Sequence, residues 1–178
     1  MIEKTLSRKT AFRGRLLRVD VVNVELESGV RSTREIVRHP GAVVVLAQRP
    51  DGRFVFVRQY RKAIEKHLLE AVAGTREPGE RPTVCARREL REETGYAAEK
   101  LIRLGVLYPA PGYTEEMLHV YFARLGLRRQ ALNPDEDEKI ETVCLTAERF
   151  ERMIAGGRIA DAKTLAAWLL YQRRAART

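Results

Sequence analysis

The chain has few cysteines and no long apolar run. Its 178 residues include only two cysteines, Cys85 and Cys144, which lie far apart and match neither a redox nor a zinc-binding spacing. We therefore expect a reduced, cytoplasmic protein. The longest apolar runs, Ala42–Ala47 and Leu165–Tyr171, are far too short to cross a bilayer, and the first ten residues carry no apolar signal core. No membrane association is expected.

Aromatic residues are also scarce, at 7% of the chain, and none of them forms an aromatic-rich RNA-binding strand motif. The net charge is +9, from 33 Lys and Arg against 24 Asp and Glu. These basic residues are spread along the whole chain without a long block. The pattern favours a generally basic surface, or attraction of a phosphorylated substrate, over a nucleic-acid site. A role as an RNA-binding module would rest on the charge alone, and we expect no nucleic-acid partner.

The residues that are abundant predict one compact α/β domain. Hydrophobic residues make up 44% of the sequence, which is enough for a core at this length. Apolar alternation and turn residues predict strands near 12–24, 32–38, 42–48, 53–59, 101–107, 117–124 and 140–145. Helices are predicted at 84–94, 147–154 and 162–173. Residues 1–40 precede the main sheet and are expected to form a small N-terminal β element, followed by the main domain at 41–178.

Three carboxylates gather on one predicted helix face. Successive helical residues turn by about 100°, so relative to Glu89 the side chains of Glu92 and Glu93 lie at roughly −60° and +40°. Like charges at this spacing repel each other unless a cation sits among them. Clustered carboxylates suit Mg²⁺ or Mn²⁺. The alternative is a solvated helix whose arginines pair with the acids. The arginines available for that pairing are Arg87, Arg88 and Arg91.

The wider sequence frame favours the metal-binding interpretation. The segment 74–96 reads GTREPGERPTVCARRELREETGY, and its spaced residues are Gly74, Glu80, Arg88-Glu89-Leu90, Glu92-Glu93, Gly95 and Tyr96. This pattern resembles the Nudix box, whose last position is usually aliphatic and is tyrosine here. The chain is thus similar to the Nudix hydrolases. That resemblance implies the Nudix fold, a mixed β-sheet sandwiched by helices.

Four segments outside the box resemble the ADP-ribose pyrophosphatase branch of that family. They are VRQYR at 57–61, LLEAVAG at 68–74, PAPGYTEE at 109–116 and DAKTL at 161–165. Val72 stands where the branch usually has proline. The resemblance implies Mg²⁺- or Mn²⁺-dependent hydrolysis of ADP-ribose to AMP and ribose 5-phosphate. Alternatives are another diphosphate (FAD, GDP-mannose or another nucleotide sugar, a dinucleoside polyphosphate) or a non-catalytic sensor of ADP-ribose-like ligands.

The resemblance also implies a set of site residues and an assembly. The implied metal ligands are Glu89, Glu92, Glu93 and the backbone carbonyl of Ala73, and the implied catalytic residues are Glu92, Glu93, Arg88 and Glu138, with Glu136 as a second candidate base. The implied substrate-binding residues are Arg61 for the diphosphate, Pro111 and Gly112 for the terminal ribose, and Arg15, Arg34 and Glu35 for the adenosine. A homodimer that exchanges the N-terminal sheet is expected as well.

Overall fold

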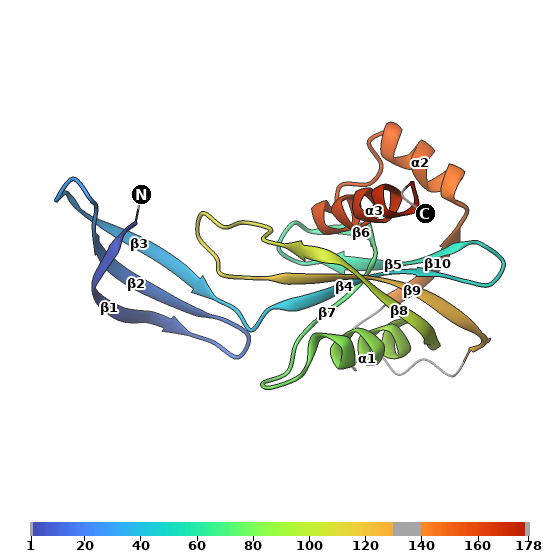
Figure 1. The fold of residues 1–178 in the computed structure, drawn as a ribbon, viewed down its shortest axis with the longest axis horizontal. Helices are drawn as coiled ribbons and strands as arrows, with labels where there is room; N and C mark the ends of the chain where they lie inside the picture. Colours follow the sequence, from blue (N-terminus) through green and yellow to red (C-terminus); the bar gives the residue numbers. More distant parts are fainter. Residues whose placement is uncertain (1, 130–139, 177–178) are drawn as a thin grey trace. The chain divides into compact units, whose positions relative to one another are not determined.

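The computed structural model describes residues 2–129 and 140–176. The chain forms two compact units, one made of residues 1–41 with 108–117 and the other of 42–107 with 118–178. The first unit therefore contains a segment that is distant in sequence. Figure 1 shows the elements of both units.

The first unit holds a three-stranded antiparallel sheet in the order β1-β2-β3. Its strands are β1 (Lys4–Arg13), β2 (Arg18–Glu25) and β3 (Arg31–Arg38). The predicted single strand at 12–24 is wrong, because the N–H of Gly14 donates to the Leu17 carbonyl at 2.9 Å in a turn between β1 and β2. The sequence of β1, KTLSRKTAFR, has no apolar alternation from which a strand could be predicted. This agrees with its environment, because every residue of β1 is exposed.

The segment 108–117 is fastened to the end of β3. The N–H of Val37 donates to the Tyr113 carbonyl at 2.8 Å, and the N–H of Glu115 donates to the Val37 carbonyl at 3.1 Å. Arg38 donates to Glu115 at 2.6 Å and to the buried Asp20 at 3.0 Å. Backbone and charged contacts together explain why this segment belongs to the first unit.

The second unit is built on a seven-stranded mixed sheet. The path runs β10-β5-β4-β9-β8, with β6 paired to β5 and β7 paired to β4. Strands β4 and β9 are parallel, and the other pairs are antiparallel. The strands are β4 (Ala42–Gln48), β5 (Phe54–Arg61), β6 (Lys66–Glu70), β7 (Val72–Thr75), β8 (Tyr96–Leu107), β9 (Leu118–Arg129) and β10 (Ile140–Leu145). The predicted mixed sheet is confirmed.

Helices cover both faces of this sheet, as Figure 1 shows. They are α1 (Pro82–Thr94), α2 (Ala147–Ala155) and α3 (Ala162–Ala175). The alternation along β5 sends Val55 and Val57 into a core cluster with residues of α1. It sends Phe54 and Phe56 into a second cluster with residues of α2 and α3. The predicted sandwich of helix, sheet and helices is therefore present.

The observed helix bounds differ from the predicted ones by at most two residues. Pro82 opens α1, and Gly95 ends it with a φ of 73°, a left-handed conformation that glycine adopts readily. The side chains of Thr146 and Asp161 cap α2 and α3. Trp168 of α3 is 3% exposed and meets Phe54 edge to face, with the ring centroids 4.9 Å apart, so it belongs to the core.

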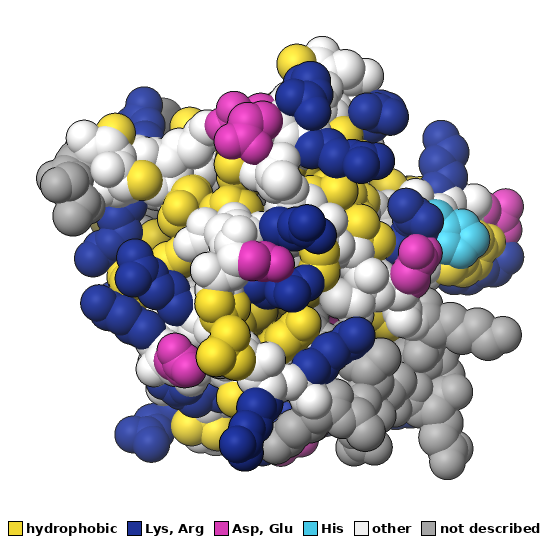
Figure 2. All heavy atoms as spheres, turned by 90° about the vertical axis from the view of Figure 1, so that its right-hand side faces the viewer, with side chains coloured by type: hydrophobic (Ala, Val, Ile, Leu, Met, Phe, Trp, Pro, Cys, Tyr) yellow, Lys and Arg dark blue, Asp and Glu magenta, His cyan; other side chains and the backbone are white. Residues whose placement is uncertain are grey.

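Within the described residues, no helix combines the length and apolar character needed to cross a membrane. Figure 2 shows lysine and arginine side chains scattered over one face, with fewer acidic side chains among them. This distribution agrees with the net charge of +9 and with the absence of a long basic block in the sequence.

Candidate active site

The three glutamates of α1 differ in burial. The side chain of Glu89 is 13% exposed and that of Glu92 is 32% exposed, while Glu93 as a residue is 6% exposed. Clustered acids were expected to need a cation, and Arg88 supplies one. Its Nη1 donates to Glu89 Oε1 at 2.7 Å and to Glu92 Oε2 at 3.0 Å. The arginine thus holds two of the three carboxylates in place.

Arg88 also ties the helix to the segment before it. Its Nε and Nη2 donate to the two carboxylate oxygens of Glu80 at 3.1 and 3.0 Å, and Nη2 donates to the Thr75 carbonyl at 3.2 Å. The hydrogen bonds from Arg88 lower the pKa of Glu80 from its ordinary 4.5 to about 2. No role was predicted for Glu80 from the sequence. The only sign in the sequence that Glu80 has a role was its fixed position in the Nudix box.

The pairing of Glu80 predicts a specific pH dependence of stability. Because the folded pKa of about 2 lies below the ordinary value, ionised Glu80 stabilises the fold above pH about 4.5, and this contribution is lost as the pH falls toward 2. The free energy of unfolding of the wild type minus that of Glu80→Gln should be constant above pH about 5 and shrink at lower pH. Urea unfolding at a series of pH values measures this difference. A difference that is flat down to pH 3 would contradict the assignment.

Strand β7 lies directly against Glu89. A Cβ added at Gly74 would overlap the Glu89 carboxylate. The carboxylate therefore occupies the space that a side chain at residue 74 would need, and only glycine allows this close approach. Ala73, whose carbonyl was implied as a metal ligand, is the preceding residue on the same strand. The fold therefore brings Ala73 and Glu89, sixteen positions apart in the sequence, to the same small region.

The donor set fits a hard divalent cation. Carboxylate oxygens and a backbone carbonyl are ligands that Mg²⁺ and Mn²⁺ accept. Among the residues that the structure describes, no three Asp, Glu, His or Cys side chains already converge as a metal cluster. The contacts of Arg88 explain this for Glu89 and Glu92, whose oxygens face its guanidinium. A bound cation would replace or share those contacts.

Arg61 lies at the end of β5 and forms a bidentate ion pair with Glu70. Its Nε and Nη2 donate to the two carboxylate oxygens of Glu70 at 2.8 and 2.7 Å. The hydrogen bonds to Glu70 raise the pKa of Arg61, and the nearby charges of Glu93 and Asp161 raise that pKa further. A guanidinium has five N–H donors, so two directed at Glu70 leave it able to bind a phosphate. The side chain is 40% exposed.

Two predicted substrate residues lie on β3, in the first unit. Arg34 donates through Nε to Glu3 at 3.1 Å and through Nη1 to Ser32 at 2.8 Å, and Glu35 on the same strand is exposed. Arg15 is exposed in the turn between β1 and β2. The structure describes these residues only within their own unit, so their predicted contact with adenosine stays a prediction.

Pro111 and Gly112 are exposed in the segment 108–117. A Cβ added at Gly112 would meet nothing within 4 Å, so packing does not require glycine there. The predicted approach of a ribose to this backbone stays a prediction. The two candidate bases, Glu138 and Glu136, lie outside the described residues.

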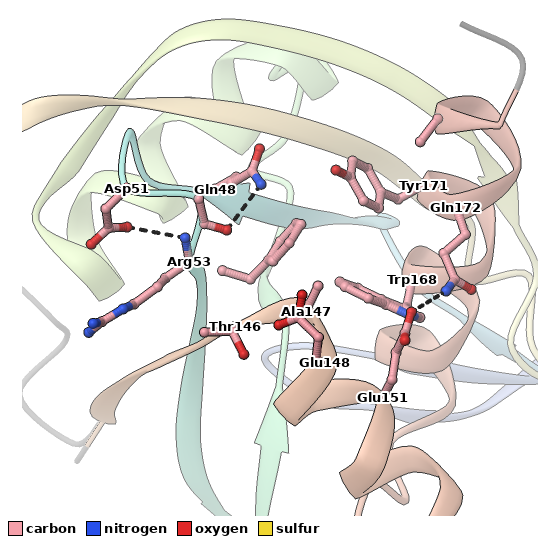
Figure 3. A pocket seen from close by; sticks show the side chains of 13 residues that line it. Gln48, Asp51, Arg53, Thr146, Ala147, Glu148, Glu151, Trp168, Tyr171 and Gln172 are labelled. Carbon is pink, nitrogen blue, oxygen red and sulfur yellow. Dashed lines mark hydrogen bonds between the residues drawn. The ribbon is translucent and has the colours of Figure 1, made fainter.

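A separate cavity of about 660 Å³ lies between the β4–β5 hairpin, α2 and α3. Figure 3 shows Trp168 and Tyr171 at its wall, together with a hydrogen bond of 2.6 Å from Gln172 to Glu151. Its walls belong to the α2 and α3 side of the sheet, whereas the glutamates project from α1, which covers the other side. We therefore place the candidate active site at α1 and β7.

Comparison with known proteins finds a matching family model and several relatives. The NUDIX domain model matches residues 37–168. An ADP-ribose pyrophosphatase of Bacillus subtilis is 41% identical over 163 residues, covering 91% of this chain and 88% of the relative. A methanol dehydrogenase activator of Bacillus methanolicus is 43% identical over 166 residues, covering 93% and 90%. A GDP-mannose pyrophosphatase of Yersinia enterocolitica is 36% identical over 148 residues, covering 78% and 76%.

A solved structure described as an ADP compounds hydrolase is similar over 97% of this chain and 94% of its own, with a TM-score of 0.84 and 27% sequence identity. The family match and the identities show that the chain belongs to the Nudix family. Within that family it belongs to the ADP-ribose pyrophosphatase-like branch.

Proposed function

We propose that the protein hydrolyses the diphosphate bond of ADP-ribose, giving AMP and ribose 5-phosphate. The observation that carries this proposal is the Glu89 carboxylate, which packs against Gly74, the residue after Ala73, and lies within the network of Arg88. The similarity to an ADP-ribose pyrophosphatase and to an ADP compounds hydrolase supports the choice of substrate. The cofactor is Mg²⁺ or Mn²⁺, and the protein is expected to act in the cytoplasm.

The residues divide into three roles. Glu89, Glu92, Glu93 and the carbonyl of Ala73 would hold the divalent ion, which would neutralise diphosphate oxygens and activate a water. Arg88 orients Glu89 and Glu92 through the hydrogen bonds described above. Arg61 binds the diphosphate through donors that Glu70 does not use. Glu138 is the proposed base.

A substrate panel tests the proposal. ADP-ribose, GDP-mannose, FAD and a dinucleoside polyphosphate are each incubated with the protein and Mg²⁺, and the products are separated by chromatography. AMP and ribose 5-phosphate should appear fastest. A kcat/KM for another substrate more than about ten times that for ADP-ribose would overturn the substrate and leave the Nudix assignment intact.

GDP-mannose is the second candidate substrate, because one relative with 36% identity is a GDP-mannose pyrophosphatase. Val72, in place of the usual proline beside Ala73, is the feature of this chain that could reshape the pocket for it. The name of the Bacillus methanolicus relative describes an effect on another enzyme rather than a substrate, so it favours neither candidate. A non-catalytic sensor would bind ADP-ribose without releasing AMP in the same panel.

Arg61→Ala is expected to weaken substrate binding. Losing charge-assisted hydrogen bonds to a phosphate costs about 1.5–3 kcal/mol, which corresponds to a loss of roughly tenfold to a hundredfold in kcat/KM, mainly through KM. The affinity for Mg²⁺ in the absence of substrate should stay unchanged. Steady-state kinetics and calorimetric titration of Mg²⁺ measure the two effects. An unchanged KM would contradict the proposal that Arg61 binds the diphosphate.

We further propose a homodimer with the first unit at the interface. That unit exposes large apolar side chains, and a small isolated sheet buries little by itself. These side chains include Ile2, Leu6, Phe12, Leu16 and Val30. Light scattering at micromolar concentration should give twice the mass of the 20.3 kDa chain, and Leu16→Glu should weaken the dimer. A fully active wild-type monomer would count decisively against it.

A further inference from the structure

The first turn of α3 contains a chain of hydrogen bonds that leaves the helix. Asp161 accepts from the N–H of Thr164 at 3.0 Å, which is an ordinary helix cap. The Thr164 hydroxyl, however, donates to Asp161 and also accepts from the N–H of Ala71 at 2.7 Å. Thr164 and Ala71 are both fully buried. The cap of α3 is thus joined to the junction between β6 and β7.

Lys163 joins the same turn to the neighbouring residue of that junction. Its ammonium donates to the carboxylate of Glu70 and, at 2.9 Å, to Asp161. Glu70 is fully buried and also receives the two-pronged contact from Arg61. Burial alone would raise the pKa of Glu70, but Arg61 and Lys163 outweigh burial and lower this pKa. Glu70 is therefore an anion held between two cations.

The charges of this cluster balance. Arg61 and Lys163 carry two positive charges, and Glu70 and Asp161 carry two negative charges. Removing the charge of Lys163 would leave a net charge of −1 beside the arginine proposed to bind a diphosphate. A diphosphate is itself anionic, so Lys163 affects its binding without needing to touch it.

The second connection reaches the metal-binding backbone. Ala71 immediately precedes β7, on which Ala73 and Gly74 lie against Glu89. A buried N–H that loses its acceptor destabilises the local structure, and a rearrangement of the backbone relieves that cost. The Thr164 hydroxyl therefore fixes where β7 begins. The cap of α2, the other helix on this side of the sheet, is local: the Thr146 side chain accepts at 3.3 Å from the N–H of Arg149 in its own helix.

We propose that the first turn of α3, Asp161–Thr164, is a positioning element for the candidate active site. Lys163 acts through Glu70 on Arg61, and Thr164 acts through Ala71 on the carbonyl of Ala73. The inference rests on the proposed function for the roles of Arg61 and Ala73. It assigns these residues no contact with the substrate.

The first arm of the test compares Lys163→Met with Lys163→Arg and with Lys100→Met, a change at an exposed lysine of β8. Calorimetry measures binding of a non-hydrolysable methylene analogue of ADP-ribose, and kinetics separates KM from kcat. Lys163→Met should weaken analogue binding and raise KM about tenfold, with kcat within about twofold of wild type. Lys163→Arg should restore most of the affinity, and Lys100→Met should change nothing.

The second arm compares Thr164→Val with Thr164→Ser and with Thr146→Val, which removes the cap of α2. Calorimetric titration of Mg²⁺ without substrate is the readout. Thr164→Val should weaken Mg²⁺ binding about fivefold or more, and Thr164→Ser should restore it. Thr146→Val should lower the melting temperature, as loss of a helix cap does, without changing Mg²⁺ binding.

The outcomes separate the two proposals. A wild type that binds Mg²⁺ and the analogue but hydrolyses no diphosphate overturns the proposed function, while both binding readouts still decide the role of α3. If the wild type is active and either Lys163→Met or Thr164→Val behaves like its control, the positioning role is overturned alone. A wild type that binds neither Mg²⁺ nor the analogue overturns both.

Discussion

Glu93→Gln is expected to reduce kcat by at least ~10²-fold while the protein stays folded, because a charge that stabilises the transition state is lost. Glu93 lies one helical turn after Glu89 and is 6% exposed. Glutamine has nearly the same shape and carries no charge, so its burial costs less than burial of an ionised carboxylate. The melting temperature should therefore remain close to that of the wild type.

The measurement is turnover of ADP-ribose at saturating Mg²⁺, together with thermal unfolding. Glu99→Gln is the matched control, since Glu99 is an exposed glutamate of β8 outside the candidate site. The control should keep full activity. Near-normal turnover of Glu93→Gln at saturating Mg²⁺ would refute the assignment of Glu93 as a metal ligand.

The elements that position this site were predictable because their signals are local. The apolar run of β4 was predicted at its observed bounds, 42–48. Helix α1 was predicted to end at 94, as observed, and to begin at 84, two residues after its observed start at Pro82. Strand β8 instead begins at Tyr96, five residues before the predicted start at 101. Its first residues mix apolar and charged side chains, and pairing with β9 decides their conformation.

The contacts within the site could not be predicted in the same way. Glu70 and Lys163 are 93 residues apart, and nothing in either local sequence indicates the other. Arg61 was predicted to donate to the diphosphate. Its ion pair with Glu70 was not predicted. Likewise, Gly74 was known only as a fixed position of the box. Its reason, the approach of the Glu89 carboxylate, is a tertiary contact between β7 and α1.

That contact makes Gly74→Ala the second substitution with a large expected effect. A methyl group at residue 74 would overlap the Glu89 carboxylate, and a side-chain end can move away more easily than the paired backbone of β7. The fold should therefore survive while Glu89 leaves its place beside Ala73. Because an active site loses its effect when a ligand is displaced by about 1 Å, we expect kcat/KM to fall by at least ~10²-fold.

A matched control separates displacement of Glu89 from a general cost of adding a methyl group. A Cβ at Gly126, in β9, would also meet a glutamate, with Glu99 Oε1 at 3.2 Å, but that glutamate is outside the candidate site. Gly126→Ala should keep both activity and Mg²⁺ affinity. Gly74→Ala should lose Mg²⁺ affinity in a calorimetric titration without substrate, and the loss should accompany the fall in kcat/KM. If Gly74→Ala bound Mg²⁺ as the wild type does, the close approach of β7 to Glu89 would have no part in holding the metal.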